Sequence, residues 1–234
     1  MKQERARRTR EQVLDAAAAE FAARGFAQTR LDTVVARTGM SKGALYGHFR
    51  SKEDLARALL RHADLAWAEL LSAAAQPGLS PLAELERITV GLDGQLRSDL
   101  RIRAALRLSA ELPPGERGGS VPLGPIPERM VRLAALAQSA HAIQSIYAPA
   151  AVAQLLLTAV LGAQALTVLR LDTEIPCPIS ELWQLLSLAA TGGQAPGADG
   201  GQAPGADADG GPGPRAPADP GAAAPRPVPG ITEW

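Results

Sequence analysis

The sequence of 234 residues predicts an all-α protein of about nine helices, divided into three parts. Apolar residues recur at helical spacing up to residue 190, and segments rich in glycine and proline separate one helix from the next. Residues 191–234 contain 30 Gly, Ala and Pro in 44 positions and include GGQAPGAD twice in succession. We therefore expect a helix-turn-helix domain at residues 1–50, a second helical domain at residues 51–190 and a disordered tail at residues 191–234.

The first ten residues contain five cations, and we expect them to form a flexible basic arm that either contacts phosphates or only aids solubility. A first helix is predicted from Thr9 to Arg24, with Gly25 past its end. Its apolar face, which includes Phe21, would brace the two helices that follow.

Residues 29–60 contain the start and stop signals of three helices. Thr29 and Asp32 have the spacing of a capping box, and Gly39 supplies the left-handed residue that ends the helix at Thr38. Two residues later, Ser41 is expected to cap a second helix that extends to Phe49. A second capping box, formed by Ser51 and Asp54, opens the third helix. Two short helices joined by a glycine turn predict a helix-turn-helix motif.

The helix at residues 41–49 is the candidate for a DNA major groove. Lys42 lies in its first turn, Gly43 lets the backbone approach closely, and Tyr46 and His48 follow one turn later. Leu45 and Phe49, four residues apart, are left to face the core. From spacing alone, an ordinary solvated surface remains an equal alternative.

The helices of the second domain follow from apolar spacing and from their caps. The first of them, from Ser51 to Ala75, is long enough to join the head mechanically to the rest of the chain. Five further helices are predicted at residues 80–98, 101–112, 127–145, 149–169 and 179–190, with a long loop at residues 113–127.

Residues 149–169 contain no charged side chain, which raises the possibility of a membrane span. Four polar residues and the absence of a second hydrophobic span argue against it. We expect instead that this helix and the helix at residues 179–190 form a dimer interface as a four-helix bundle, with Leu156 and Leu186 buried between the two copies.

Charge is unevenly distributed although the formal net charge is zero. Residues 1–62 contain 13 Lys and Arg against 7 Asp and Glu, so only this part is suited to bind nucleic acid. A single cysteine, Cys177, excludes an intrachain disulfide, and the N-terminus lacks a signal peptide, so we expect a cytoplasmic protein. We find no catalytic or metal-binding cluster, and we expect no cofactor and no enzymatic activity.

Residues 29–60 resemble the N-terminal domain of TetR-type repressors. Within them, KGALYGHFRSKEDLA is similar to the gamma-butyrolactone autoregulator receptors of antibiotic-producing actinomycetes. Weaker similarity at residues 107–111 and 181–183 extends the match to roughly residues 8–190. The resemblance implies a homodimeric repressor of secondary metabolism that binds a pseudo-palindromic operator and is released by a small signalling molecule. A repressor that has lost its ligand is the alternative, and an enzyme is a remote one.

The resemblance also implies roles for individual residues. Lys42 would contact a base edge and Gly43 would allow close approach, while Tyr46, His48 and Lys52 would contact phosphates. Ser41 completes this expected DNA-binding set.

For the ligand, the resemblance places Ile126 where the butyrolactone receptors carry a tryptophan that closes over the lactone. Loss of the indole predicts a pseudo-receptor whose ligand is a butenolide, a furan or an antibiotic-like product instead of a small butyrolactone. Thr158, Gln164 and Trp183 are the other expected pocket residues, with core, interface or surface positions as the alternatives.

Overall fold

The structure, a computed structural model, describes residues 2–168 and 178–190, all within one compact unit that comprises residues 1–195. The predicted tail at residues 191–234, Cys177 and the side chain of Leu186 lie outside the described part.

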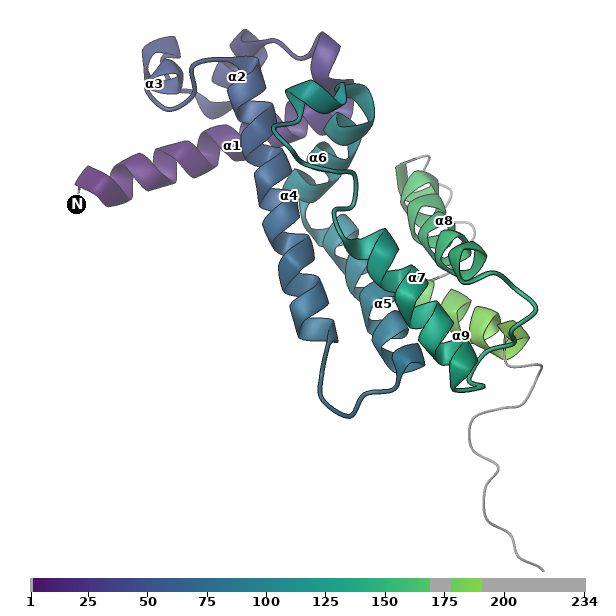
Figure 1. Cartoon of the computed structure of the whole chain (residues 1–234). Coiled ribbons are helices and arrows are strands. Elements are labelled where there is room, and N and C mark those ends of the chain that lie inside the picture. The colour runs from purple at the N-terminus through teal and green to yellow at the C-terminus, as the bar shows by residue number, and fades with distance from the viewer. Residues whose placement is uncertain (1, 169–177, 191–234) are drawn as a thin grey trace, which may run out of the picture. The chain divides into compact units, whose positions relative to one another are not determined.

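Within the described residues the protein contains α-helices, one 3-10 helix and no strand, which confirms the predicted all-α class (Figure 1). In chain order, the helices are α1 (Lys2–Gln28), α2 (Leu31–Thr38), α3 (Lys42–Tyr46), α4 (Lys52–Ala74), α5 (Pro81–Ser98), α6 (Leu100–Glu111), η1 (Pro114–Glu116), α7 (Ile126–Ser139), α8 (Pro149–Val168) and α9 (Ile179–Ala190).

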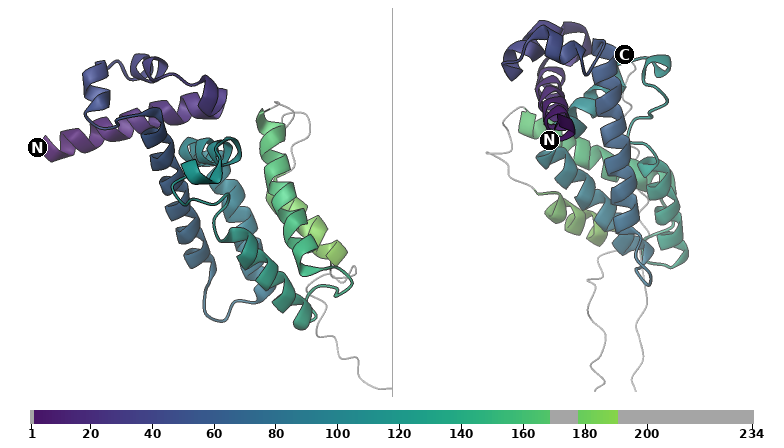
Figure 2. Two further views of the ribbon diagram at one scale, coloured as in Figure 1. Left: turned by 45° about the horizontal axis from the view of Figure 1, so that its top comes forward. Right: turned by 90° about the vertical axis from the view of Figure 1, so that its left-hand side faces the viewer.

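The head consists of α1, α2 and α3, with α2 and α3 along one side of α1 (Figure 2, left). Phe21, Val34 and Leu45 are almost fully buried between these helices. As predicted, Gly39 ends α2 in the left-handed conformation, with φ of 66°, and the Ser41 hydroxyl accepts a hydrogen bond from Ala44 N at the start of α3. The helix-turn-helix motif is therefore built as its local signals indicate.

Three predictions for the head were wrong. Helix α3 ends at Tyr46 and not at Phe49, because residues 47–48 form a turn. Residues 2–10 are helical and not a flexible arm, because α1 begins at Lys2 and the Glu4 carboxylate pairs with Arg7 and Arg8 on the next turn. The capping box at Thr29 does not form, since the Thr29 hydroxyl donates to the Gly25 carbonyl oxygen and α2 begins without a side-chain cap. At Ser51 the hydroxyl accepts from Asp54 N as predicted, but the Asp54 carboxylate accepts from Arg50 N and not from Ser51 N.

Beyond the head, α5 lies between α4 on one side and α8 and α9 on the other (Figures 1 and 2). Leu85, Ile88 and Leu92 of α5 are buried in this core, as is Trp67 of α4. The predicted helix at residues 127–145 ends earlier, at Ser139, and His141 in the following turn adopts a positive φ of 55°.

Helix α8 buries one narrow face, formed by Ala153, Leu156, Val160 and Ala163. Leu156 is only 3% exposed, so its side chain belongs to the core of one protomer, and its predicted position on a dimer interface was wrong. The sequence could not distinguish the faces of α8, because apolar residues occur all around it.

In the described part of the chain, α8 has the length and composition of a membrane span over Pro149–Thr167, with a mean hydropathy of 1.6 and 22% of the segment buried. Leu155 and Leu166 are among its exposed residues. An apolar, largely uncovered face is therefore a property of α8 in the single chain.

Candidate nucleic-acid interface and cavity

Helix α3 turns one face inward and leaves the other in solvent. Leu45 is 1% exposed, whereas Tyr46 is 51% exposed and Ser41, Lys42 and Gly43 are also exposed. The predicted DNA-binding residues of α3 therefore share an accessible surface at the edge of the head (Figure 2, left).

Gly43 is not required by the fold. Its φ is not in the left-handed region, and a Cβ built at Gly43 would meet only Ser41 Oγ, at 3.9 Å. Neither the backbone conformation nor a contact within the protein therefore requires glycine at this exposed position.

Lys42 forms an exposed ion pair with Asp32 of α2, with 2.8 Å between Nζ and Oδ1. The hydrogen bond and the charge of Asp32 raise the pKa of Lys42, which therefore remains protonated. Since both groups are largely in solvent, the pair is weak and a stronger anionic partner can displace Asp32.

Lys52 has a structural partner that the sequence did not indicate. Its ammonium donates to the Phe26 carbonyl oxygen at 2.8 Å and lies 4.3 Å from the centroid of the Phe26 ring. The side chain thus joins the start of α4 to the end of α1, and a phosphate would have to use the remaining N–H groups. His48 is half-buried beside α3.

Helix α1 holds the motif in place through two further contacts. Arg37 of α2 donates twice to the buried Glu20 carboxylate, at 3.1 and 3.0 Å. Burial opposes the charge of Glu20, but Arg37 and Arg24 outweigh this effect and lower its pKa. Arg10 lies over the Phe49 ring, 5.2 Å from its centroid. The position of α3 therefore depends on α1.

Helix α6 is joined to α1 at both ends, whereas the sequence predicted only α4 as the link between the head and the rest of the chain. At one end, Arg101 binds Glu11 at 2.6 Å and Asp15 at 2.7 Å. At the other end, Arg107 donates to the Ala22 carbonyl oxygen, and Glu111 accepts from Phe26 N. Partners about 85 residues apart leave no local sequence signal, so this connection is visible only in the structure.

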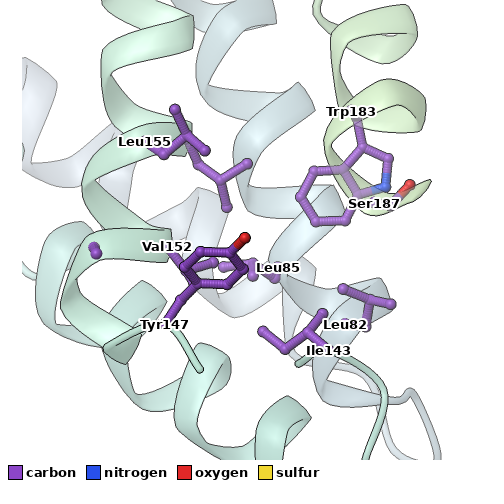
Figure 3. A pocket seen from close by; sticks show the side chains of 10 residues that line it. Leu82, Leu85, Ile143, Tyr147, Val152, Leu155, Trp183 and Ser187 are labelled. Atoms are coloured by element: carbon purple, nitrogen blue, oxygen red, sulfur yellow. The ribbon is translucent and has the colours of Figure 1, made fainter. Parts of the chain in front are cut away.

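A cavity of about 290 Å³ lies between α5, α8, α9 and the segment that precedes α8 (Figure 3). Its walls are mainly aliphatic, and the lining residues are Leu82, Leu85, Ile143, Tyr147, Ala151, Val152, Leu155, Leu156, Trp183 and Ser187. Tyr147 and Leu155 are about half exposed, so the cavity opens to the surface on their side.

Of the four predicted pocket residues, only Trp183 lines this cavity. Ile126 is fully buried in the core at the start of α7. Thr158 is exposed on α8, and Gln164 donates to the carboxylate of the buried Asp93 at 3.1 Å. The structure therefore does not bring these four residues together, because they lie on different faces of three helices.

A family model described as bacterial regulatory proteins of the tetR family matches residues 13–59. The probable HTH-type transcriptional regulator ArpR of Pseudomonas putida is 33% identical over 101 residues, which are 43% of this chain and 48% of the relative. The chain thus spans about half the length of the curated relatives it matches. These relatives are named as HTH-type transcriptional regulators.

Solved structures match a larger part of the chain. One gamma-butyrolactone receptor, described as ArpA-like, is 28% identical with a TM-score of 0.64, over 81% of this chain and all of that one. A second is 31% identical with a TM-score of 0.59, over 80% of this chain and 96% of that one. The resemblance predicted from residues 29–60 is thereby confirmed. The 31% identity over nearly the whole of the second receptor, together with the matched head, shows that the chain belongs to the TetR family of bacterial regulatory proteins.

Proposed function

We propose that the protein is a homodimeric, ligand-responsive transcriptional repressor of the cytoplasm. Each protomer would insert α3 into one major groove of a pseudo-palindromic operator, and a small signalling molecule would release the complex. By analogy with the receptors it resembles, we infer that the regulated genes belong to secondary metabolism.

The observation that carries this proposal is the exposed face of α3. It presents a cation, a residue without a side chain and an aromatic hydroxyl, at Lys42, Gly43 and Tyr46. The glycine is unexplained by the fold, but it would let the α3 backbone approach DNA closely. We assign Lys42 to guanine acceptors and Tyr46, His48 and Lys52 to phosphates.

The dimer would form through α8 and α9. Leu166 and Leu185 are exposed on these helices, at 38% and 62%, and none of the side chains of α8 is charged. A second copy that covers this surface would build a four-helix bundle and would also explain an apolar α8 in a protein that binds DNA.

Release would require a ligand that binds better to a dimer whose heads do not match the spacing of about 34 Å between major grooves. Within one protomer, α6 connects α4 to α1. Asp99 caps α6 and accepts a hydrogen bond from His62 of α4 at 2.7 Å. Arg101, in the first turn of α6, forms ion pairs with Glu11 and Asp15 of α1. A shift between α4 and α6 would therefore turn α1 and the head with it.

Replacing Lys42 by Ala is expected to weaken operator binding by about 1–3 kcal/mol and to relax selection at one base pair, because a bidentate base contact is lost. Fluorescence anisotropy on operator DNA and on a scrambled duplex measures both effects. Lys52→Ala is the control, since loss of a phosphate contact weakens both complexes alike. Equal losses on the two duplexes for Lys42→Ala would assign Lys42 to phosphate as well.

The ligand class is tested by titrating the operator complex with butyrolactones and, in parallel, with butenolides, furans and antibiotic-like products. We expect release by one of the latter compounds and not by nanomolar butyrolactone, since Ile126 stands where the receptors carry an indole. Release by nanomolar butyrolactone would reject the pseudo-receptor, and stable binding with every compound would favour a ligand-independent repressor.

A further inference from the structure

The cavity between α5, α8 and α9 is closed on its inner side by residues of the protomer core. Leu85 and Leu156 are 1% and 3% exposed, and Trp183 is 7% exposed. Figure 3 shows the Tyr147 and Trp183 rings on opposite sides of the space, with Leu155 above it and Ile143 below it. The inner wall of this site is therefore buried, and its outer side is open to the surface.

The chemistry of the walls restricts what can enter. None of the ten lining residues carries a charge, and the only side-chain groups able to hydrogen-bond are those of Tyr147, Trp183 and Ser187. The Ser187 hydroxyl already donates to the Gln184 carbonyl oxygen at 3.0 Å. Among the described residues, no side chain binds the Tyr147 hydroxyl, which points towards the space in Figure 3.

The volume restricts the size of the occupant. A cavity of about 290 Å³ lies just below the range of ~300–1,000 Å³ for ligand sites, so it suits one small molecule and excludes a peptide segment or a large cofactor. A charged group would lose its hydration there without gaining an ionic partner.

We propose that this cavity binds a neutral, predominantly apolar small molecule, stacked between Tyr147 and Trp183, with one polar atom that bonds to the Tyr147 hydroxyl. The site rests on the proposed function in one respect, because the ligand would be the signal that the repressor senses. It differs from the ligand site expected from the sequence, since Ile126, Thr158 and Gln164 do not line it.

Two fluorescent probes of one skeleton test the proposal on the full-length protein. N-phenyl-1-naphthylamine is neutral, whereas 1-anilinonaphthalene-8-sulfonate adds a sulfonate to the same aromatic skeleton. We expect saturable binding of one neutral probe per chain and at least about tenfold weaker binding of the sulfonate, because desolvation of the charge is not compensated. Equal affinity for the two probes would overturn the proposal.

Two neighbouring alanines of α8 locate the probe. Both alanines are exposed, but only Ala151 lines the cavity. Ala151→Phe should fill part of the cavity and weaken binding of the neutral probe by about tenfold or more. Ala150→Phe should leave the affinity of the probe unchanged. Circular dichroism and thermal unfolding of both variants show whether each is folded. A folded Ala151→Phe variant with undiminished affinity would place the probe elsewhere and reject the site.

A second copy of the chain is the competing occupant. If the wild-type dimer excludes the probe and a monomeric Leu185→Asp variant binds it, the partner subunit covers the cavity and the proposal fails. Operator binding is measured without any probe, so it tests the proposed repressor function independently of the cavity. Failure of probe binding with intact operator binding rejects only the cavity, whereas loss of operator binding rejects the proposed function.

Discussion

Replacing Leu185 by Asp is expected to convert the dimer into monomers and to weaken operator binding by about 10²–10⁴-fold. The Leu185 side chain is 62% exposed in the single chain, on the apolar surface that α8 and α9 share. A carboxylate there would be buried without a partner when two copies meet. Sedimentation analysis measures the oligomeric state, and anisotropy measures operator affinity. The loss on DNA follows because a monomer contacts only one half-site.

Leu65→Asp is the matched control for this change. Leu65 lies on α4 and is 67% exposed, so the same substitution alters the charge and solubility of the chain to the same extent. We expect this variant to remain dimeric and to bind the operator as the wild type does. A dimeric Leu185→Asp protein with unchanged affinity would move the interface away from α9.

Gly25→Ala is expected to reduce the free energy of unfolding by about 2–3 kcal/mol and to loosen the head. Gly25 interrupts α1 with φ of 75° and ψ of −179°, a conformation that is essentially restricted to glycine. A Cβ at this position would also overlap the Glu111 carboxylate, which accepts the hydrogen bond from Phe26 N. Denaturant unfolding measures the stability, and operator affinity reports on the position of α3.

Gly39→Ala is the comparison for a glycine in the ordinary left-handed region. Gly39 has φ of 66° and ψ of 11°, and a Cβ there would have no neighbour within 4 Å. We expect this variant to lose only about 1 kcal/mol, the cost of that backbone conformation. A similar loss in both variants would mean that neither the more restricted conformation of Gly25 nor the overlap with Glu111 adds to the cost.

The start and stop signals of the helix-turn-helix could be read from the sequence because they act over a few residues. Ser41 and Ser51 cap the helices that follow them, and Gly39 ends α2. Thr29 has the same chemistry as those serines, yet its hydroxyl is used by the Gly25 carbonyl oxygen. That acceptor is available only because α1 is interrupted at Gly25, which a capping pattern cannot indicate.

The sequence by itself determined the helical class, the α3 face with Lys42 and Tyr46, and the start and end of α4, α5 and α9, because each depends on spacing and caps within one segment. Tertiary structure decided which side of α8 is buried, where the Lys52 ammonium binds and how α6 is joined to α1. It also decided that Trp183, without Ile126, Thr158 or Gln164, lines the cavity. These properties depend on residues brought together from distant helices, and an apolar helix such as α8 carries no pattern that selects its partners in advance.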